Sequence, residues 1–113
     1  MEQADAYQVL PGLHLNGKLT VTENLADLGG VSLAYEGLQS YLQEQPDANK
    51  KIDGYTPQQR CFLAWAQVWA SKSQEALSRQ LAETDAHSPG PYRTFAPSQH
   101  EAGFFDAFGI VPG

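Results

Sequence analysis

Cysteine, positive charge and long apolar runs are all scarce in this sequence. Cys61 is the only cysteine among 113 residues, so no internal disulfide can form. Seven Lys and Arg residues stand against 13 Asp and Glu, and the formal net charge of −6 argues against a basic surface for nucleic acid or anionic lipid. No apolar run approaches the roughly 18 residues of a membrane span, and the basic-then-apolar order of a signal peptide is missing. We expect no nucleic-acid partner and no direct membrane contact from this segment, and its localisation stays open.

The length and the hydrophobic pattern predict one helical unit. A chain of 113 residues forms at most one domain with a modest core. Residues 1–20 contain Pro11-Gly12 and Asn16-Gly17, dipeptides that favour tight turns, and are predicted to be a turn-rich lead-in. Residues 21–109 show helical periodicity. We therefore expect an all-α segment with about four helices in a small bundle joined by long loops.

Capping signals and apolar spacing place the four helices. The first spans about residues 21–45 and the third about residues 73–82. The second begins at Thr56, which is followed by a proline and a capping-box glutamine. The fourth opens with a second capping box at residues 98–101 and ends at Gly109. The second helix has an aromatic inner face, so we expect it to be the most buried helix of the chain, with its two tryptophans, Trp65 and Trp69, in the core.

Two glycines interrupt the first helical pattern. Gly29 and Gly30 each cost roughly 1 kcal/mol relative to alanine inside a helix. A cost of that size predicts tight backbone packing at this point. The alternative is a helix that begins only after the glycines.

The chemistry-bearing residues are ambiguous when each is taken alone. Residues 23–27 (ENLAD) place the carboxylates of Glu23 and Asp27 four positions apart, on one helical face. Such a pair is more often a solvated surface than a site. Read in isolation, His87 is a loop residue near the end of the third helix, and Arg93 is a partner in a surface salt bridge.

Taken together, however, these motifs resemble the neprilysin family of zinc endopeptidases. Residues 23–27 match its E-N-x-A-D motif, and four further segments match family motifs that occur in the same order along the chain. These are residues 16–20 (NGKLT), 67–69 (QVW), 85–93 (DAHSPGPYR) and 104–108 (FFDAF). The resemblance covers about residues 11–109. It implies the C-terminal part of a larger gluzincin-type catalytic domain that cleaves oligopeptides by attack of zinc-activated water.

The resemblance also implies a role for each candidate residue. Glu23 would be a zinc ligand, and Asp27 would orient a histidine that binds the same ion. His87 would stabilise the oxyanion, with Asp85 orienting its ring. Arg93 would hydrogen-bond a substrate carbonyl. The implied cofactor is one zinc ion in the complete enzyme, and the implied partners are peptide substrates and the N-terminal remainder of the peptidase.

Two departures from the family limit what the resemblance implies. It has no H-E-x-x-H, the motif that supplies two zinc-binding histidines and the general base, so we expect the isolated chain to be inactive and without zinc. Thr22 stands where the family often has glycine, and a threonine N-cap there would shift the helix start by a residue. The alternative function is a free-standing helical interaction module that has lost its catalytic role.

Overall fold

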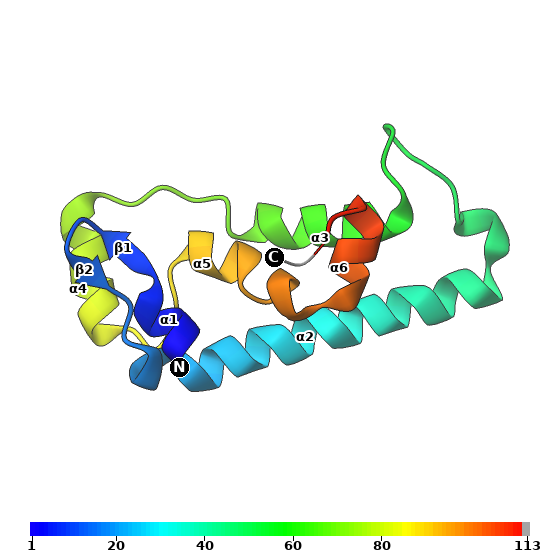
Figure 1. Cartoon of the computed structure of the whole chain (residues 1–113). Helices are drawn as coiled ribbons and strands as arrows, with labels where there is room; N and C mark the ends of the chain where they lie inside the picture. Colours follow the sequence, from blue (N-terminus) through cyan, green and yellow to red (C-terminus); the bar gives the residue numbers. More distant parts are fainter. Residues whose placement is uncertain (112–113) are drawn as a thin grey trace.

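One long helix, α2 (Gly17–Glu44), runs the length of the molecule in the computed structural model, which describes residues 1–111 (Figure 1). The molecule measures 48 × 25 × 24 Å along its principal axes. The other elements, in chain order, are α1 (Glu2–Ala6), β1 (Gln8–Leu10), β2 (Leu13–His14), the 3-10 turn η1 (Pro46–Ala48), α3 (Pro57–Val68), α4 (Glu75–Thr84), α5 (Gly90–Phe95), the 3-10 turn η2 (Ser98–His100) and α6 (Ala102–Phe108). The mainly helical fold is confirmed. All four expected helices are present, and the short helices α1 and α5 were not expected.

The lead-in is shorter and more structured than predicted. Pro11-Gly12 does form a turn, with Gly12 at φ +76°, and it joins β1 and β2 into an antiparallel hairpin. Asn16-Gly17 is instead a helix start: the Asn16 side chain accepts the backbone N–H of Leu19 at 3.0 Å. α2 therefore begins at residue 17, not 21, and Thr22 lies inside it.

The close approach of α1 explains the glycine at the start of α2. A Cβ at Gly17 would lie 2.5 Å from the backbone oxygen of Met1. No larger residue fits without moving α1. The constraint on this glycine is thus a contact between two helices, and not the positive φ that a turn would require.

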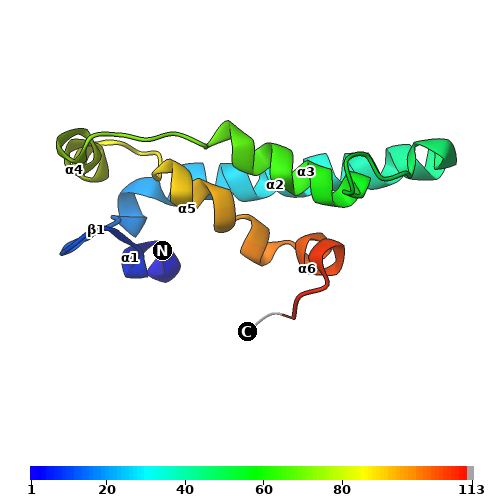
Figure 2. The same ribbon diagram turned by 90° about the horizontal axis from the view of Figure 1, so that it is seen from above.

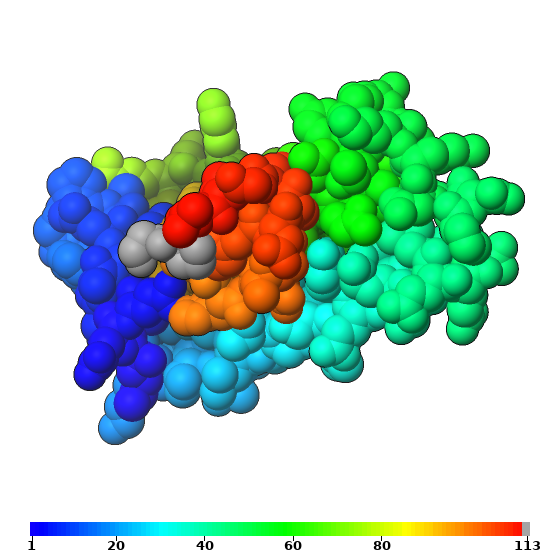
Figure 3. All heavy atoms as spheres, turned by 45° about the vertical axis from the view of Figure 1, so that its right-hand side comes forward, coloured from blue at the N-terminus to red at the C-terminus, as the bar shows by residue number. Residues whose placement is uncertain are grey.

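Two clusters of side chains hold the elements together. Ala4, Leu15, Tyr92 and Ala96 form a buried cluster where α1 and the hairpin meet α5. Aromatic rings join α2, α3 and α6 at the other cluster, with ring centroids 5.1–6.5 Å apart. Its members are Tyr35, Phe62, Phe104 and Phe108. Helix α6 consequently lies to one side of α2 and α3, whereas α5 overlaps α2 in the same view (Figure 2), and α6 packs closely against α3 (Figure 3).

Burial is distributed differently from the prediction. α3 buries Pro57 and Phe62 among its 12 residues, and both Trp65 and the C-cap residue Trp69 are half-buried. α2 buries five of its 28 residues, so the buried fractions of the two helices are similar. The two tryptophans that were expected in the core are therefore only partly covered.

The predicted helix boundaries are confirmed where they depend on neighbouring residues alone. The Thr56 capping box is confirmed, with reciprocal hydrogen bonds to Gln59 of 3.1 and 3.0 Å. Gly109 ends α6 at φ +62°, as expected. The box at residues 98–101 does not form: η2 occupies it, and the Glu101 side chain caps α6 by accepting from the Gly103 N–H.

Gly29 and Gly30 lie on a face of α2 that no other described element covers. α2 continues through both glycines, and a Cβ at either would meet no atom within 4 Å. The tight packing expected there is absent within residues 1–111. The exposed residues at this helical spacing, which we call the α2 outer face, are Leu25, Ala26, Gly29, Gly30, Leu33, Ala34 and Gly37. Leu25 and Leu33 are 62% and 71% exposed, and among residues 1–111 no other element lies below α2 in Figure 1.

Length alone does not make α2 a membrane helix. It has 28 residues, but neither it nor any other helix within residues 1–111 is both long enough and apolar enough to cross a membrane.

Gly103 is expected to tolerate no side chain. A Cβ there would overlap the ring of Tyr35, so Gly103→Ala should lower the free energy of unfolding by about 1–3 kcal/mol, as overpacked positions do. Gly37→Ala is the matched control, because a Cβ at that helical position meets nothing within 4 Å and should raise stability by up to about 1 kcal/mol. Urea denaturation followed by circular dichroism measures both. Shifts of the same sign and size would contradict the packing of α6 on α2.

Candidate functional site

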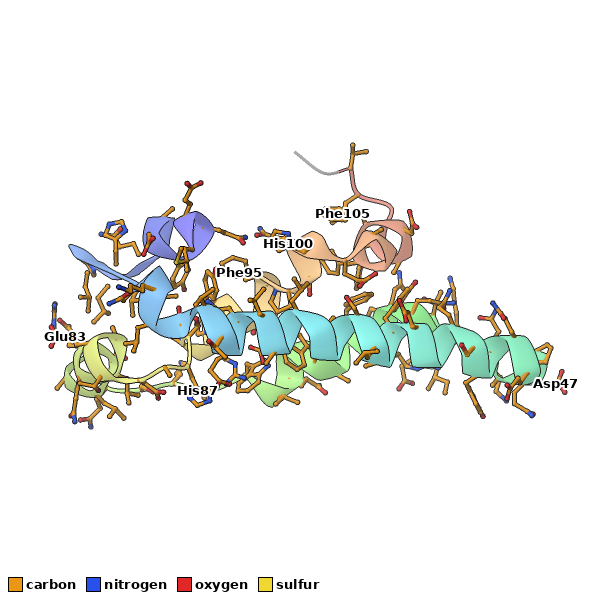
Figure 4. All side chains as sticks on the ribbon, turned by 90° about the horizontal axis from the view of Figure 1, so that it is seen from below. Asp47, Glu83, His87, Phe95, His100 and Phe105 are labelled. Atoms are coloured by element: carbon orange, nitrogen blue, oxygen red, sulfur yellow. The ribbon has the colours of Figure 1, made fainter. Side chains whose placement is uncertain are left out.

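The fold brings the four candidate residues together from distant parts of the chain. Glu23 and Asp27 lie on α2, His87 lies in the loop between α4 and α5, and Arg93 lies on α5. Asp27 and Arg93 are 66 positions apart in sequence and form an ion pair. His87 lies beside the N-terminal half of α2 (Figure 4), with its Nε2 3.4 Å from the Oε2 of Glu23.

The pair between Asp27 and Arg93 is buried and bidentate. Nε and Nη2 of Arg93 each donate to a different oxygen of Asp27, both at 2.6 Å. The Arg93 side chain is 15% exposed and the Asp27 side chain is 9% exposed. The Arg93 Cζ lies 3.7 Å from the ring centroid of Trp69, and the indole N–H of Trp65 donates to the Arg93 carbonyl at 2.8 Å. Arg93 is therefore held by its ion pair with Asp27, by stacking on Trp69 and by the hydrogen bond to its backbone carbonyl. It is not the partner in a surface salt bridge that the sequence alone favoured.

Asp85 holds the ring of His87. Its Oδ1 accepts both the backbone N–H of His87, at 2.9 Å, and the ring Nδ1, at 2.8 Å. These hydrogen bonds from His87 hold the pKa of the Asp85 carboxyl below its usual range. A carboxylate at Nδ1 assigns a proton to that nitrogen, and Nε2 is then the atom that faces Glu23. The Asp85 carboxylate thus lies in contact with the His87 ring, which is the geometry that its expected orienting role requires.

A chain of hydrogen bonds runs beside these residues. Ser88 Oγ donates to Asn24 Oδ1 at 2.6 Å, and Asn24 Nδ2 donates to Thr20 Oγ1 at 3.1 Å. The Thr20 hydroxyl in turn donates to the carbonyl of Asn16 at 3.1 Å. Sequence reasoning missed Ser88, because no spacing rule connects positions 24 and 88.

Sequence reasoning also placed Trp69 in the core and missed its contact with Arg93. Trp69 and Arg93 border a cavity of about 450 Å³ beside His87, lined further by Ser71, Leu81 and Pro89. A cavity of that size suits a few side chains of a ligand. Spacing within α3 puts Trp69 on the aromatic face, but only the fold shows that this face ends at the cavity.

Glu23 fits an incomplete zinc site. Its carboxylate is 37% exposed and is of the oxygen type that zinc accepts. A catalytic zinc takes three protein ligands, whereas residues 1–111 contain no group of three His, Cys, Asp or Glu side chains placed to hold a metal. A zinc site that included Glu23 would therefore need its other ligands from outside the described residues.

Three comparisons with known proteins agree with one another. The model of peptidase family M13 matches residues 1–113. Mouse neprilysin is 36% identical over 105 residues, which are 91% of this chain and 14% of that protein. Neprilysin-11 of Caenorhabditis elegans is 34% identical over 111 residues, 96% of this chain and 13% of the relative. The cryo-EM structure of the Mycobacterium tuberculosis zinc metalloprotease ZMP1 in its open state superposes with a TM-score of 0.88 at 34% identity, over 97% of this chain and 18% of that one.

Arg93 is expected to stabilise the fold far more than an exposed arginine does. Arg93→Ala leaves the buried Asp27 carboxylate unpaired and should cost about 3–5 kcal/mol of unfolding free energy. The control is Arg79→Ala, whose pair with Glu75 is exposed and should contribute less than about 1 kcal/mol. Chemical denaturation of both variants makes the comparison. Equal losses would show that Asp27 is not buried against Arg93.

Proposed function

Because this chain belongs to peptidase family M13, the neprilysin family of zinc metallopeptidases, we propose that it is the C-terminal part of a catalytic domain that cleaves oligopeptides. The chain spans 14% of the length of mouse neprilysin, so the rest of such a domain would come from a longer protein. The observation that supports this most is that His87 lines one cavity together with Arg93 and also lies 3.4 Å from the Glu23 carboxylate.

Glu23 is the proposed zinc ligand. Its carboxylate is accessible, and the chain's own partner nearest to it, His87 Nε2, lies at 3.4 Å, so no short hydrogen bond would have to break. When bound, zinc supplies Lewis-acid activation of water and of the scissile carbonyl. Two histidines and the general base would come from an H-E-x-x-H motif outside these residues.

His87 is the proposed oxyanion donor. The oxyanion of an attacked peptide carbonyl needs a hydrogen-bond donor fixed in place before the reaction. Asp85 fixes the ring by accepting from Nδ1 and directs Nε2 toward Glu23, where the reacting carbonyl would lie. Donation from Nε2 requires a proton on that nitrogen in addition to the one on Nδ1.

Arg93 is the proposed substrate clamp, and Asp27 supports it. A guanidinium has five N–H donors, and Asp27 accepts from two of its nitrogens, which leaves donors for a backbone carbonyl in the cavity. Asp27 also keeps the role that the family resemblance implies, orientation of a zinc-binding histidine. Each carboxylate oxygen has two lone pairs, so a histidine N–H can bind beside Arg93.

The α2 outer face is the proposed contact with the N-terminal remainder of the peptidase. It is apolar, contains small residues that allow another helix to approach closely, and continues from the turn of α2 that carries Glu23. An element lying there would be beside Glu23, where the missing zinc ligands have to be. The isolated chain is accordingly proposed to be inactive. The free-standing interaction module would use the same face for an unrelated partner, but it leaves the convergence of Glu23 and His87 unexplained.

Zinc content and turnover of the complete peptidase separate these roles. Glu23→Ala should abolish zinc retention, whereas Glu36→Ala, an exposed glutamate further along α2, should keep both zinc and activity. His87→Ala should retain zinc and lower kcat by about 10²–10³-fold with a smaller change in KM, as loss of an oxyanion donor does. Metal analysis and steady-state kinetics measure these effects. An active, zinc-loaded Glu23→Ala enzyme would contradict the assignment.

Gly30→Leu tests the proposed covering of the α2 outer face. In the isolated chain the new side chain meets no atom near its Cβ, and its helix propensity should raise stability by up to about 1 kcal/mol. In the complete peptidase the same change should lower the Tm and the zinc content, because it would overpack a contact. The isolated chain is the matched control. A complete peptidase that tolerates Gly30→Leu would show that this face is not covered.

A further inference from the structure

We propose that Asn24 and Ser88 are positioning residues, whose hydrogen bond sets the distance between the Glu23 carboxylate and the His87 imidazole. This inference rests on the proposed function. Asn24 directly follows Glu23, and Ser88 directly follows His87. The 2.6 Å bond from Ser88 Oγ to Asn24 Oδ1 thus joins the residues next to the two that would act on a substrate.

The orientation of the Asn24 amide is determined by its neighbours. Its oxygen accepts from Ser88 while its nitrogen donates to Thr20, whose hydroxyl donates to the Asn16 carbonyl. Every donor along this series has one acceptor, and the series ends at the N-cap of α2. Thr20 is 0% and Ser88 5% exposed, so water competes weakly for these bonds. The result is a rigid connection from the helix start to the His87 loop.

The contact between His87 and Glu23 cannot hold the loop by itself. Both side chains are well exposed, at 50% and 37%, and exposed pairs of this kind contribute between nothing and about 1 kcal/mol. The Ser88 bond is short and buried. The hydrogen bond of Asp85 to His87 lies within the loop, and the bond of Arg93 to Asp27 joins α5, not the loop, to α2. Among the described residues, the Ser88 bond is therefore the side-chain hydrogen bond that ties this loop to α2.

The position of His87 matters because an oxyanion donor acts only at the correct distance. A displacement of about 1 Å at a reacting centre can cost about 10²-fold in rate. Substrate affinity depends instead on groups such as Arg93, which its own ion pair holds in place. Loss of the Asn24–Ser88 bond should therefore lower kcat and leave KM nearly unchanged.

Kinetics of the complete peptidase test this inference. Ser88→Ala and Asn24→Ala should each lower kcat by about 10–10²-fold, with KM within about twofold and zinc content unchanged. Ser88→Thr keeps the hydroxyl and should restore most of the rate. The control is Ser32→Ala, which removes a 2.7 Å hydrogen bond from α2 to Glu101 away from the site and should leave kcat unchanged.

The double variant gives a second test of the inference. Positioning through one bond predicts that Asn24→Ala adds little to Ser88→Ala in kcat, and additive losses would overturn it. Unchanged kcat in both single variants, with kcat reduced in His87→Ala, would overturn the positioning role and leave the proposed function intact. Unchanged kcat in His87→Ala as well would instead refute the proposed function.

Discussion

The buried ion pair between Asp27 and Arg93 is the interaction on which the site depends. It joins the long helix α2 to α5, and the loop with His87 lies between α5 and α4. A bidentate pair fixes both distance and angle, so it orients α5 as well as attaching it. Burial of two charges is costly unless each is fully paired, and Trp65 and Trp69 complete the surroundings of Arg93. Without this pair, α5 would lose its fixed orientation on α2, and the His87 loop would be tied to α2 by the Ser88–Asn24 hydrogen bond alone.

In the proposed function, the chemistry of the site is divided between this chain and the rest of a peptidase domain. These residues would supply one carboxylate ligand, an oriented imidazole and a guanidinium, all of which bind or stabilise charge. Activation of water needs further ligands and a base. The same division explains the exposed α2 outer face: a helix that retains adjacent glycines and exposed leucines has a surface shaped for another element.

Prediction from the sequence succeeded where neighbouring residues decide the structure. The Thr56 capping box and the end of α6 at Gly109 follow from local hydrogen bonds and a positive φ. The start of α2 was misplaced because Asn-Gly favours both a turn and a helix start, and here the Asn16 side chain caps the helix by accepting from the Leu19 N–H. α5 was missed because Pro89 and Pro91 look like helix breakers, although a proline fits the first turn of a helix.

The sequence predicted which residues belong to the candidate site, but not the contacts that position them. Motif resemblance identified Glu23, Asp27, His87 and Arg93, but Ser88 and Trp69 act through contacts that sequence spacing cannot encode. The most direct test of the account is anomalous diffraction at the zinc edge from crystals of the complete peptidase. It predicts one zinc with a Glu23 carboxylate oxygen at about 2.0–2.2 Å and two imidazole nitrogens from outside this chain. A zinc bound without Glu23 would contradict it.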